Sequence, residues 1–141
     1  MENDLSIVQL IYCSRAKNLG NNPGFERDVR DILDHSRTCN PLHDITGALM
    51  TDGEMFAQVV EGPAAAVRTL YSKIIRDKRH ENVTTLQRVL THVRLFNSWP
   101  IAFIRVENIP CIEALDVQTA PAALRKASDV VLKAFWPLLL G

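Results

Sequence analysis

Residues 45–63 read ITGALMTDGEMFAQVVEGP. Two mainly apolar runs, 45–50 and 54–61, flank the dipeptide Asp52-Gly53, which is typical of a tight hairpin turn. Gly62-Pro63 then ends the second run and favours the start of a helix, because proline is tolerated in the first helical turn. This stretch therefore predicts a β-hairpin that leads directly into a helix.

The segment before the hairpin predicts a strand and a helix. Residues 5–13 (LSIVQLIYC) are apolar on both faces, as in a central strand, and residues 17–24 are rich in turn formers. A helix follows, because apolar residues recur at helical spacing: Phe25, Val29, Ile32 and Leu33. Asn40-Pro41 ends it, since the residue before proline disfavours helical geometry.

The segment after the hairpin predicts a second helix and two further strands. The helix begins at Gly62-Pro63, and the polar run 76–82 ends it. Residues 83–96 and 99–106 have the composition of strands. The resulting order, β-α-β-β-α-β-β, predicts an α+β fold: a ferredoxin-like, mostly antiparallel sheet with two helices on one face.

The pattern changes at Pro110, which divides the chain into residues 1–108 and a C-terminal helical extension, 109–141. Residues 121–140 carry an apolar stripe at helical spacing: Leu124, Ala127, Val131, Phe135 and Leu138. The extension ends in the apolar run 135–140. This run fits an exposed interface, such as that of a homo-oligomer, and it fits packing against the sheet equally well.

The composition excludes several classes of function. The 141 residues include 16 basic and 16 acidic side chains, so the chain lacks the basic excess of a dedicated nucleic-acid-binding protein. It has no run of about 18 apolar residues that could cross a membrane. The three cysteines form no CxxC pair and the first residues form no signal peptide, so we expect a cytoplasmic protein. No phosphate-binding glycine loop or HExxH motif occurs.

Two polar residues stand inside apolar strands. Tyr12 follows a run of aliphatic residues, and Gln58 lies between Ala57 and Val59. A buried glutamine needs hydrogen-bond partners, or it costs roughly 1–3 kcal/mol. Taken alone, both residues fit a structural role better than a chemical one. The same holds for Cys39, which His35 or His43 could activate in principle, because nothing in the sequence orients such a base.

Several motifs in a fixed order point to a known family. They are YCSRA (12–16), Ser36 four residues before Asn40, ITGAL (45–49), FAQVVEG (56–62), RDKRHENV (76–83) and RLFNSW (94–99). Over residues 5–106 this series resembles the BLUF domain, which binds FAD and senses blue light. The resemblance implies a flavin-binding domain at residues 1–108.

The resemblance also implies a role for individual residues. It places the flavin, FAD or possibly FMN, between the two helices. Tyr12 matches the photoactive tyrosine, which passes an electron and a proton toward the flavin, and Gln58 matches the glutamine whose hydrogen bonds then rearrange. The positions that match flavin-contacting residues are Asn40, Arg79, His80, Ser36 and Ile32. Without the resemblance, Arg79 and His80 fit charges at a helix terminus, and Asn40 fits a helix stop.

One position departs from the family. The family usually has a methionine two residues after the tryptophan of the fifth strand, where this chain has Ile101 after Trp99. The two residues are expected to share one strand face by period two. Isoleucine keeps the bulk of methionine but loses its flexible thioether, so the output through the fifth strand is the feature that this substitution affects.

The resemblance implies a sensor and not an enzyme. The 35 residues after Val106 are too few for a cyclase, phosphodiesterase or kinase domain, so we expect a separate effector, such as a cyclic-nucleotide signalling enzyme or a transcription regulator. Two alternatives share the fold. One is an acylphosphatase-like hydrolase that uses residues 14–24 as an anion-binding loop, and the other is a non-photoactive interaction module.

Overall fold

A computed structural model describes residues 6–109 and 121–140. The strands are β1 (Ile7–Ala16), β2 (Thr46–Thr51), β3 (Met55–Pro63), β4 (His80–Thr91) and β5 (Ala102–Arg105). The helices are α1 (Pro23–Cys39), the 3-10 helix η1 (Asn40–His43), α2 (Ala64–Arg76), α4 (Pro121–Ala134) and α5 (Trp136–Leu140). This order confirms the predicted β-α-β-β-α-β-β arrangement with C-terminal helices.

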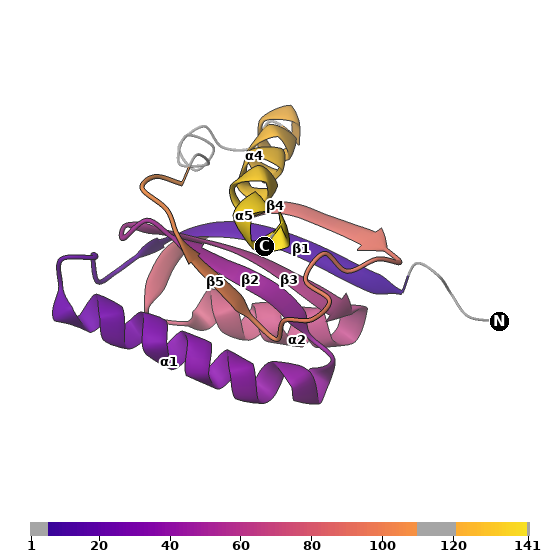
Figure 1. The fold of residues 1–141 in the computed structure, drawn as a ribbon, viewed down its shortest axis with the longest axis horizontal. Helices are drawn as coiled ribbons and strands as arrows, with labels where there is room; N and C mark the ends of the chain where they lie inside the picture. Colours follow the sequence, from indigo (N-terminus) through magenta and orange to yellow (C-terminus); the bar gives the residue numbers. More distant parts are fainter. Residues whose placement is uncertain (1–5, 110–120, 141) are drawn as a thin grey trace.

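The five strands form one mixed sheet in the order β4-β1-β3-β2-β5. The first four strands pair antiparallel, whereas β5 runs parallel to β2 at the edge. The helices α1 and α2 cover one face of the sheet, and α4 with α5 lies on the other face (Figure 1). The ferredoxin-like α+β fold is therefore confirmed, with β5 and the C-terminal helices as additions to it.

The predicted hairpin between β2 and β3 is confirmed, and its turn residues explain it. Asp52 Oδ1 accepts the backbone N–H groups of Glu54 and Met55 at 2.9 and 2.8 Å. Gly53 has a φ of 92°, a left-handed value that favours glycine. Such side-chain to backbone bonds are the usual reason for aspartate in tight turns.

Each face of the sheet has its own apolar layer. Beneath α1 lie Phe25, Val29 and Leu33, the helical stripe predicted from the sequence. On the opposite face, the stripe of α4 packs against the sheet: Ala127, Val131 and Phe135 are buried. The rings of Phe96 and Phe135 meet edge to face, with centroids 5.7 Å apart.

The C-terminal stripe therefore packs against the sheet, which was one of its two predicted positions. Ile109 and Phe135 are fully buried in the same apolar cluster as Ile11 and Phe96, so the two predicted segments, 1–108 and 109–141, share a core. The last turns still present apolar side chains to solvent, with Trp136 54% exposed. A role of this surface in homo-oligomers stays a prediction.

The fourth and fifth strands differ most from the prediction in their bounds. The fourth strand begins at His80 and ends at Thr91, whereas residues 83–96 were predicted. The polar residues 80–82 resembled a loop, but an edge strand tolerates them because one side of it faces solvent. The fifth strand is limited to Ala102–Arg105, so Trp99 and Ile101 both precede it.

Candidate functional site

A cavity of about 200 Å³ lies on the sheet face that α1 and α2 cover. Its floor comes from β1, β2 and β3, and its side walls come from the two helices and the segment after α2. The lining residues are Tyr12, Leu49, Phe56, Gln58, Ile32, His35, Ser36, Leu70, Lys73, Ile74, Asp77, Arg79 and His80. Aliphatic and aromatic walls with a few polar groups among them suit a planar heteroaromatic molecule with a hydrogen-bonding edge.

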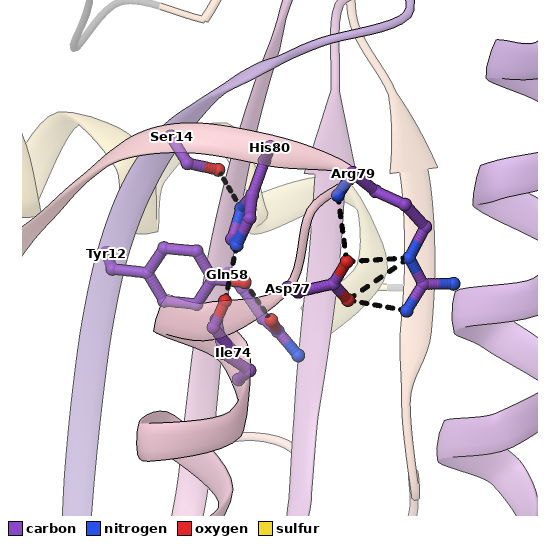
Figure 2. A network of polar contacts seen from close by, with 7 residues as sticks. All are labelled: Tyr12, Ser14, Gln58, Ile74, Asp77, Arg79 and His80. Atoms are coloured by element: carbon purple, nitrogen blue, oxygen red, sulfur yellow. Dashed lines mark hydrogen bonds and ion pairs between the residues drawn. The ribbon is translucent and has the colours of Figure 1, made fainter.

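Tyr12 and Gln58 meet at the floor of the cavity. They are directly opposite each other in the β1–β3 pairing, so their side chains leave the sheet on the same face. The phenol of Tyr12 donates a hydrogen bond to Gln58 Oε1 (Figure 2). This bond fixes the amide of Gln58, and its Nε2 group has no hydrogen-bond partner among the described residues. The glutamine thus keeps a donor for a molecule in the cavity.

The environment of Tyr12 keeps its phenol protonated. Its side chain is 3% exposed, and the rings of Tyr71 and His80 lie 5.6 and 6.2 Å away between centroids. Burial raises the pKa of Tyr12 far above its ordinary value, and the neighbouring Tyr71 and Asp77 raise it further. At neutral pH the residue is therefore a hydrogen-bond donor that also holds a transferable proton.

His80 lies buried beside this pair with both ring nitrogens in use. Its Nε2 lies 2.5 Å from the carbonyl oxygen of Ile74, and its Nδ1 lies 2.7 Å from Ser14 Oγ. Because a carbonyl can only accept, Nε2 carries a proton and donates. In the tautomer with its proton on Nε2, the ring accepts from the Ser14 hydroxyl at Nδ1. His80 thus ties β1 and the end of α2 together, and it turns its ring edge toward Tyr12.

Asp77 and Arg79, which both line the cavity, form an ion pair (Figure 2). The guanidinium donates from Nε and Nη2 to the carboxylate at 2.5 to 3.1 Å, and the backbone N–H of Arg79 donates to the same group. Burial acts to raise the pKa of Asp77, but the hydrogen bonds from Arg79 outweigh it and hold the pKa below its ordinary value. The carboxylate stays ionised and orients the guanidinium beside the cavity.

Asn40 lies where α1 passes into η1. Its side chain is 6% exposed, and Nδ2 donates to the carbonyl oxygen of Pro100 at 2.8 Å. It is not among the residues that line the cavity, whereas Ser36 and Ile32, one and two turns earlier on α1, are. The structure thus brings Tyr12, Gln58, Arg79, His80, Ser36 and Ile32 to one cavity, whereas Asn40 is not among its lining residues.

The expected shared face of Trp99 and Ile101 is wrong. Trp99 lies in the turn before β5 and is 45% exposed, whereas Ile101 is 3% exposed and packs in the apolar cluster beneath α1. Period-two alternation does not apply to them because both precede the strand. Neither residue lines the cavity.

The structure adds three residues that sequence reasoning did not assign. Asp77 orients Arg79, Ser14 holds His80, and Tyr71 contacts Tyr12. Asp77 and Ser14 both lie within the quoted motifs, so their place in those motifs could have marked them as site residues. Tyr71 stands among apolar residues on α2, and nothing in its spacing distinguishes a ring neighbour of Tyr12 from an ordinary core residue.

In the loop 14–24, considered above as an anion-binding site, several backbone N–H groups already have hydrogen-bond acceptors. The backbone N–H groups of Lys17, Gly20 and Asn22 donate to the carbonyls of Arg79, Gly53 and Leu19. An anion cradle needs such groups free and convergent. In addition, no three His, Cys, Asp or Glu side chains of the described residues lie together as metal ligands. No helix within 6–109 or 121–140 has the length and apolar character of a membrane span.

Comparisons with known proteins agree with the geometry of the cavity. Residues 7–102 match the BLUF family, described as sensors of blue light using FAD. Photoactivated adenylate cyclase subunit beta of Euglena gracilis is 33% identical over 95 residues, 67% of this chain and 11% of that protein. The blue light- and temperature-regulated antirepressor of Escherichia coli (strain K12) is 32% identical over 60 residues, 43% of this chain and 15% of that protein. The chain thus spans about a tenth of the length of the Euglena relative.

Solved structures show the same fold over nearly the whole chain. The photo-activated state of BlsA is 26% identical, with a TM-score of 0.73 and coverage of 96% of both chains. Klebsiella pneumoniae BlrP1 with FMN and cyclic diGMP is also 26% identical, with a TM-score of 0.67, and the match covers 92% of this chain and 34% of that one.

Proposed function

Because this chain belongs to the BLUF family of flavin-based blue-light sensors, we propose that Tyr12 and Gln58 are its light-reactive pair. The observation that carries the proposal is the hydrogen bond from the Tyr12 phenol to Gln58 Oε1 at the floor of the cavity. It leaves the amide donor of Gln58 available to a flavin. When bound, the flavin supplies absorption of blue light and a one-electron acceptor.

Tyr12 supplies an electron together with the proton at Oη. Its burial and its raised pKa keep that proton in place before illumination. The proton leaves along the existing hydrogen bond, because Gln58 Oε1 is the acceptor that the phenol faces. Gln58 then rotates or tautomerises, and the electron and the proton return to Tyr12, so that no net oxidation remains. The group that Gln58 presents to Tyr12 and to the cavity has then changed. Only an amide offers a donor and an acceptor on one such group.

The remaining lining residues bind and orient the cofactor. Arg79, fixed by Asp77, supplies a positive donor in the cavity wall. Ile32 and Ser36 contribute the wall from α1, and Asn40 acts from just behind it. We propose FAD as the cofactor, in keeping with the family description, with FMN as the alternative. Chromatography of the cofactor that heat releases from the purified protein distinguishes the two.

The output of the light reaction is a conformational change that an effector reads. The similar proteins named above are a cyclase subunit and an antirepressor, so a cyclic-nucleotide enzyme or a transcription regulator is the kind of effector that we propose. In this proposal the chain itself turns over no substrate and acts in the cytoplasm. Light shifts a population of states, and the effector must bind one state more tightly than the other.

The switching role of Gln58 has a direct test. Gln58→Leu keeps the bulk but removes donor and acceptor, so the variant should bind flavin and lose the light-induced red shift of the flavin band. The matched control is Gln87→Leu, on β4 and outside the cavity, which should keep the shift. A full red shift in Gln58→Leu would remove the glutamine from its proposed role.

A further inference from the structure

Tyr71 is a second tyrosine beside the light-reactive one, and the proposed reaction does not use it. It stands on α2, and its ring lies 5.6 Å from that of Tyr12 between centroids, tilted by 40°. Its hydroxyl is 2.6 Å from Thr85 Oγ1. Thr85 is the residue directly opposite Tyr12 in the β1–β4 pairing. Tyr71 thus contacts the ring of Tyr12 and is hydrogen-bonded to β4.

Strand β4 has a bulge at this point. Tyr12 pairs with Thr85 but Ile11 pairs with Gln87, so Leu86 is an extra residue on β4. A bulge interrupts the alternation of side chains between the two faces of a sheet. Thr85, opposite Tyr12, meets Tyr71 on the α2 face. The next two residues, Leu86 and Gln87, both lie on the opposite face, where Leu86, 4% exposed, packs in the apolar cluster and Gln87 contacts α4.

The bulge leads directly to the C-terminal helix. Gln87 Oε1 accepts a hydrogen bond from Ser128 Oγ of α4 at 3.1 Å, and Ser128 is fully buried. Leu86 shares its apolar cluster with Ala127 and Val131 of the same helix. Contacts therefore run without interruption from Tyr12 through Tyr71 and Thr85 to the bulge, and from the bulge to α4.

We propose that the Tyr71–Thr85 hydrogen bond and the β4 bulge carry the light state of Tyr12 to α4, with Tyr71 as a positioning residue. The proposal rests on the proposed roles of Tyr12 and Gln58. Once Gln58 turns its amide, Tyr12 Oη faces an NH2 donor in place of a carbonyl acceptor, so the phenol must accept and its own O–H must turn away. The ring then changes its position against Tyr71, which Thr85 holds to the strand.

The test compares variants that each remove one hydroxyl. Tyr71→Phe and Thr85→Val keep ring and shape, and the double variant shows whether the two act through one bond. The control is Thr84→Val, whose hydroxyl donates only to Asn82 O on the same strand. For the full chain loaded with FAD, two quantities are measured: the light-induced red shift, and the light-minus-dark difference in amide hydrogen exchange across residues 127–135.

We expect the wild type and Thr84→Val to show both the red shift and the exchange difference. Tyr71→Phe, Thr85→Val and their combination should keep the red shift and show an exchange difference about two- to ten-fold smaller, the size of one net hydrogen bond. The inference would be overturned if both single variants showed the same exchange difference as the wild type. It would also be overturned if the effects of the two substitutions added in the double variant. If the wild type shows the red shift but no exchange difference across residues 127–135, this inference fails and the proposed function stands. If the wild type shows no red shift, the proposed function fails.

Discussion

The side chain of Asn40 donates a hydrogen bond from Nδ2 to the carbonyl oxygen of Pro100 at 2.8 Å. It thereby joins the end of α1 to the segment that precedes β5. The same segment is held a second time, because Gly47 N–H donates to the carbonyl of Trp99 at 3.2 Å. A residue proposed to act on the flavin from α1 thus also fixes the chain between Trp99 and Ile101.

Asn40→Ala should change both functions of this side chain. Losing one net hydrogen bond to the flavin costs about 1 kcal/mol, so the flavin dissociation constant should rise about five-fold. Amide hydrogen exchange across residues 99–103 should also become faster, because the tie to Pro100 is gone. Asn97→Ala, an exposed change in the same connection, is the control. Unchanged affinity together with faster exchange would restrict Asn40 to the structural role.

Arg79→Ala should weaken flavin binding more strongly. A hydrogen bond from a charged donor is worth roughly 1.5–3 kcal/mol, which corresponds to about ten- to a hundred-fold in affinity. Asp77→Asn should have a smaller effect, since the guanidinium remains but loses its orienting carboxylate. Titration of each apoprotein with FAD measures the dissociation constant of the wild type, Arg79→Ala and Asp77→Asn. The exposed Arg76, at the end of α2 and outside the cavity, provides the control Arg76→Ala. Equal affinities for the two arginine variants would contradict this role.

The buried phenol of Tyr12 predicts a loss of stability in alkali. Burial raises the pKa of Tyr12 in the folded protein above its ordinary value of 10.0, so above that pH only the unfolded chain gives up this proton. The free energy of unfolding should then fall by about 1.4 kcal/mol per pH unit through this residue alone, and the residue should contribute no slope below pH 10. Urea unfolding between about pH 9 and 11 measures the slope, which should be smaller by that amount in Tyr12→Phe. Identical slopes would show that the phenol ionises in the folded protein.

The C-terminal helices should contribute to the stability of the whole domain. Phe135 is fully buried against Phe96, so Phe135→Ala should lower the free energy of unfolding by about 3–5 kcal/mol. Trp136→Ala, at the neighbouring but half-exposed position, should lower it by less than about 1 kcal/mol. Chemical denaturation followed by circular dichroism compares them. A Phe135→Ala protein as stable as Trp136→Ala would mean that the helix is not part of the core.

Local chemistry made much of the fold predictable from the sequence. Asp52-Gly53 forms the turn that its residue types require, and Phe25, Val29 and Leu33 are buried as their spacing indicated. The parallel pairing of β5 with β2 was not predictable, because it depends on how a long connection crosses the sheet and not on any local pattern. The strand-face argument for Trp99 and Ile101 failed for a related reason, since the pattern does not mark where β5 begins.

The site residues that lie within the family motifs were predictable from the sequence. Motif matching found Tyr12, Gln58, Arg79 and His80, and the structure gathers them at one cavity. It did not assign Tyr71, because the ring contact with Tyr12 arises from the packing of α2 on β1. Thr85 lies opposite Tyr12 because of the bulge in β4, and no residue type in that strand predicts a bulge.

The central claim is that Tyr12, through its hydrogen bond to Gln58, makes the bound flavin respond to blue light. The most direct measurement is the absorption spectrum of the purified flavin-loaded protein in darkness, under blue light and after return to darkness, for wild type and Tyr12→Phe. The account predicts a red shift of the flavin band in the wild type that reverses in darkness, and no such shift in Tyr12→Phe, which keeps its flavin because only one hydroxyl is removed. A full and reversible red shift in Tyr12→Phe, or a flavin-loaded wild type that does not respond to light, would contradict it.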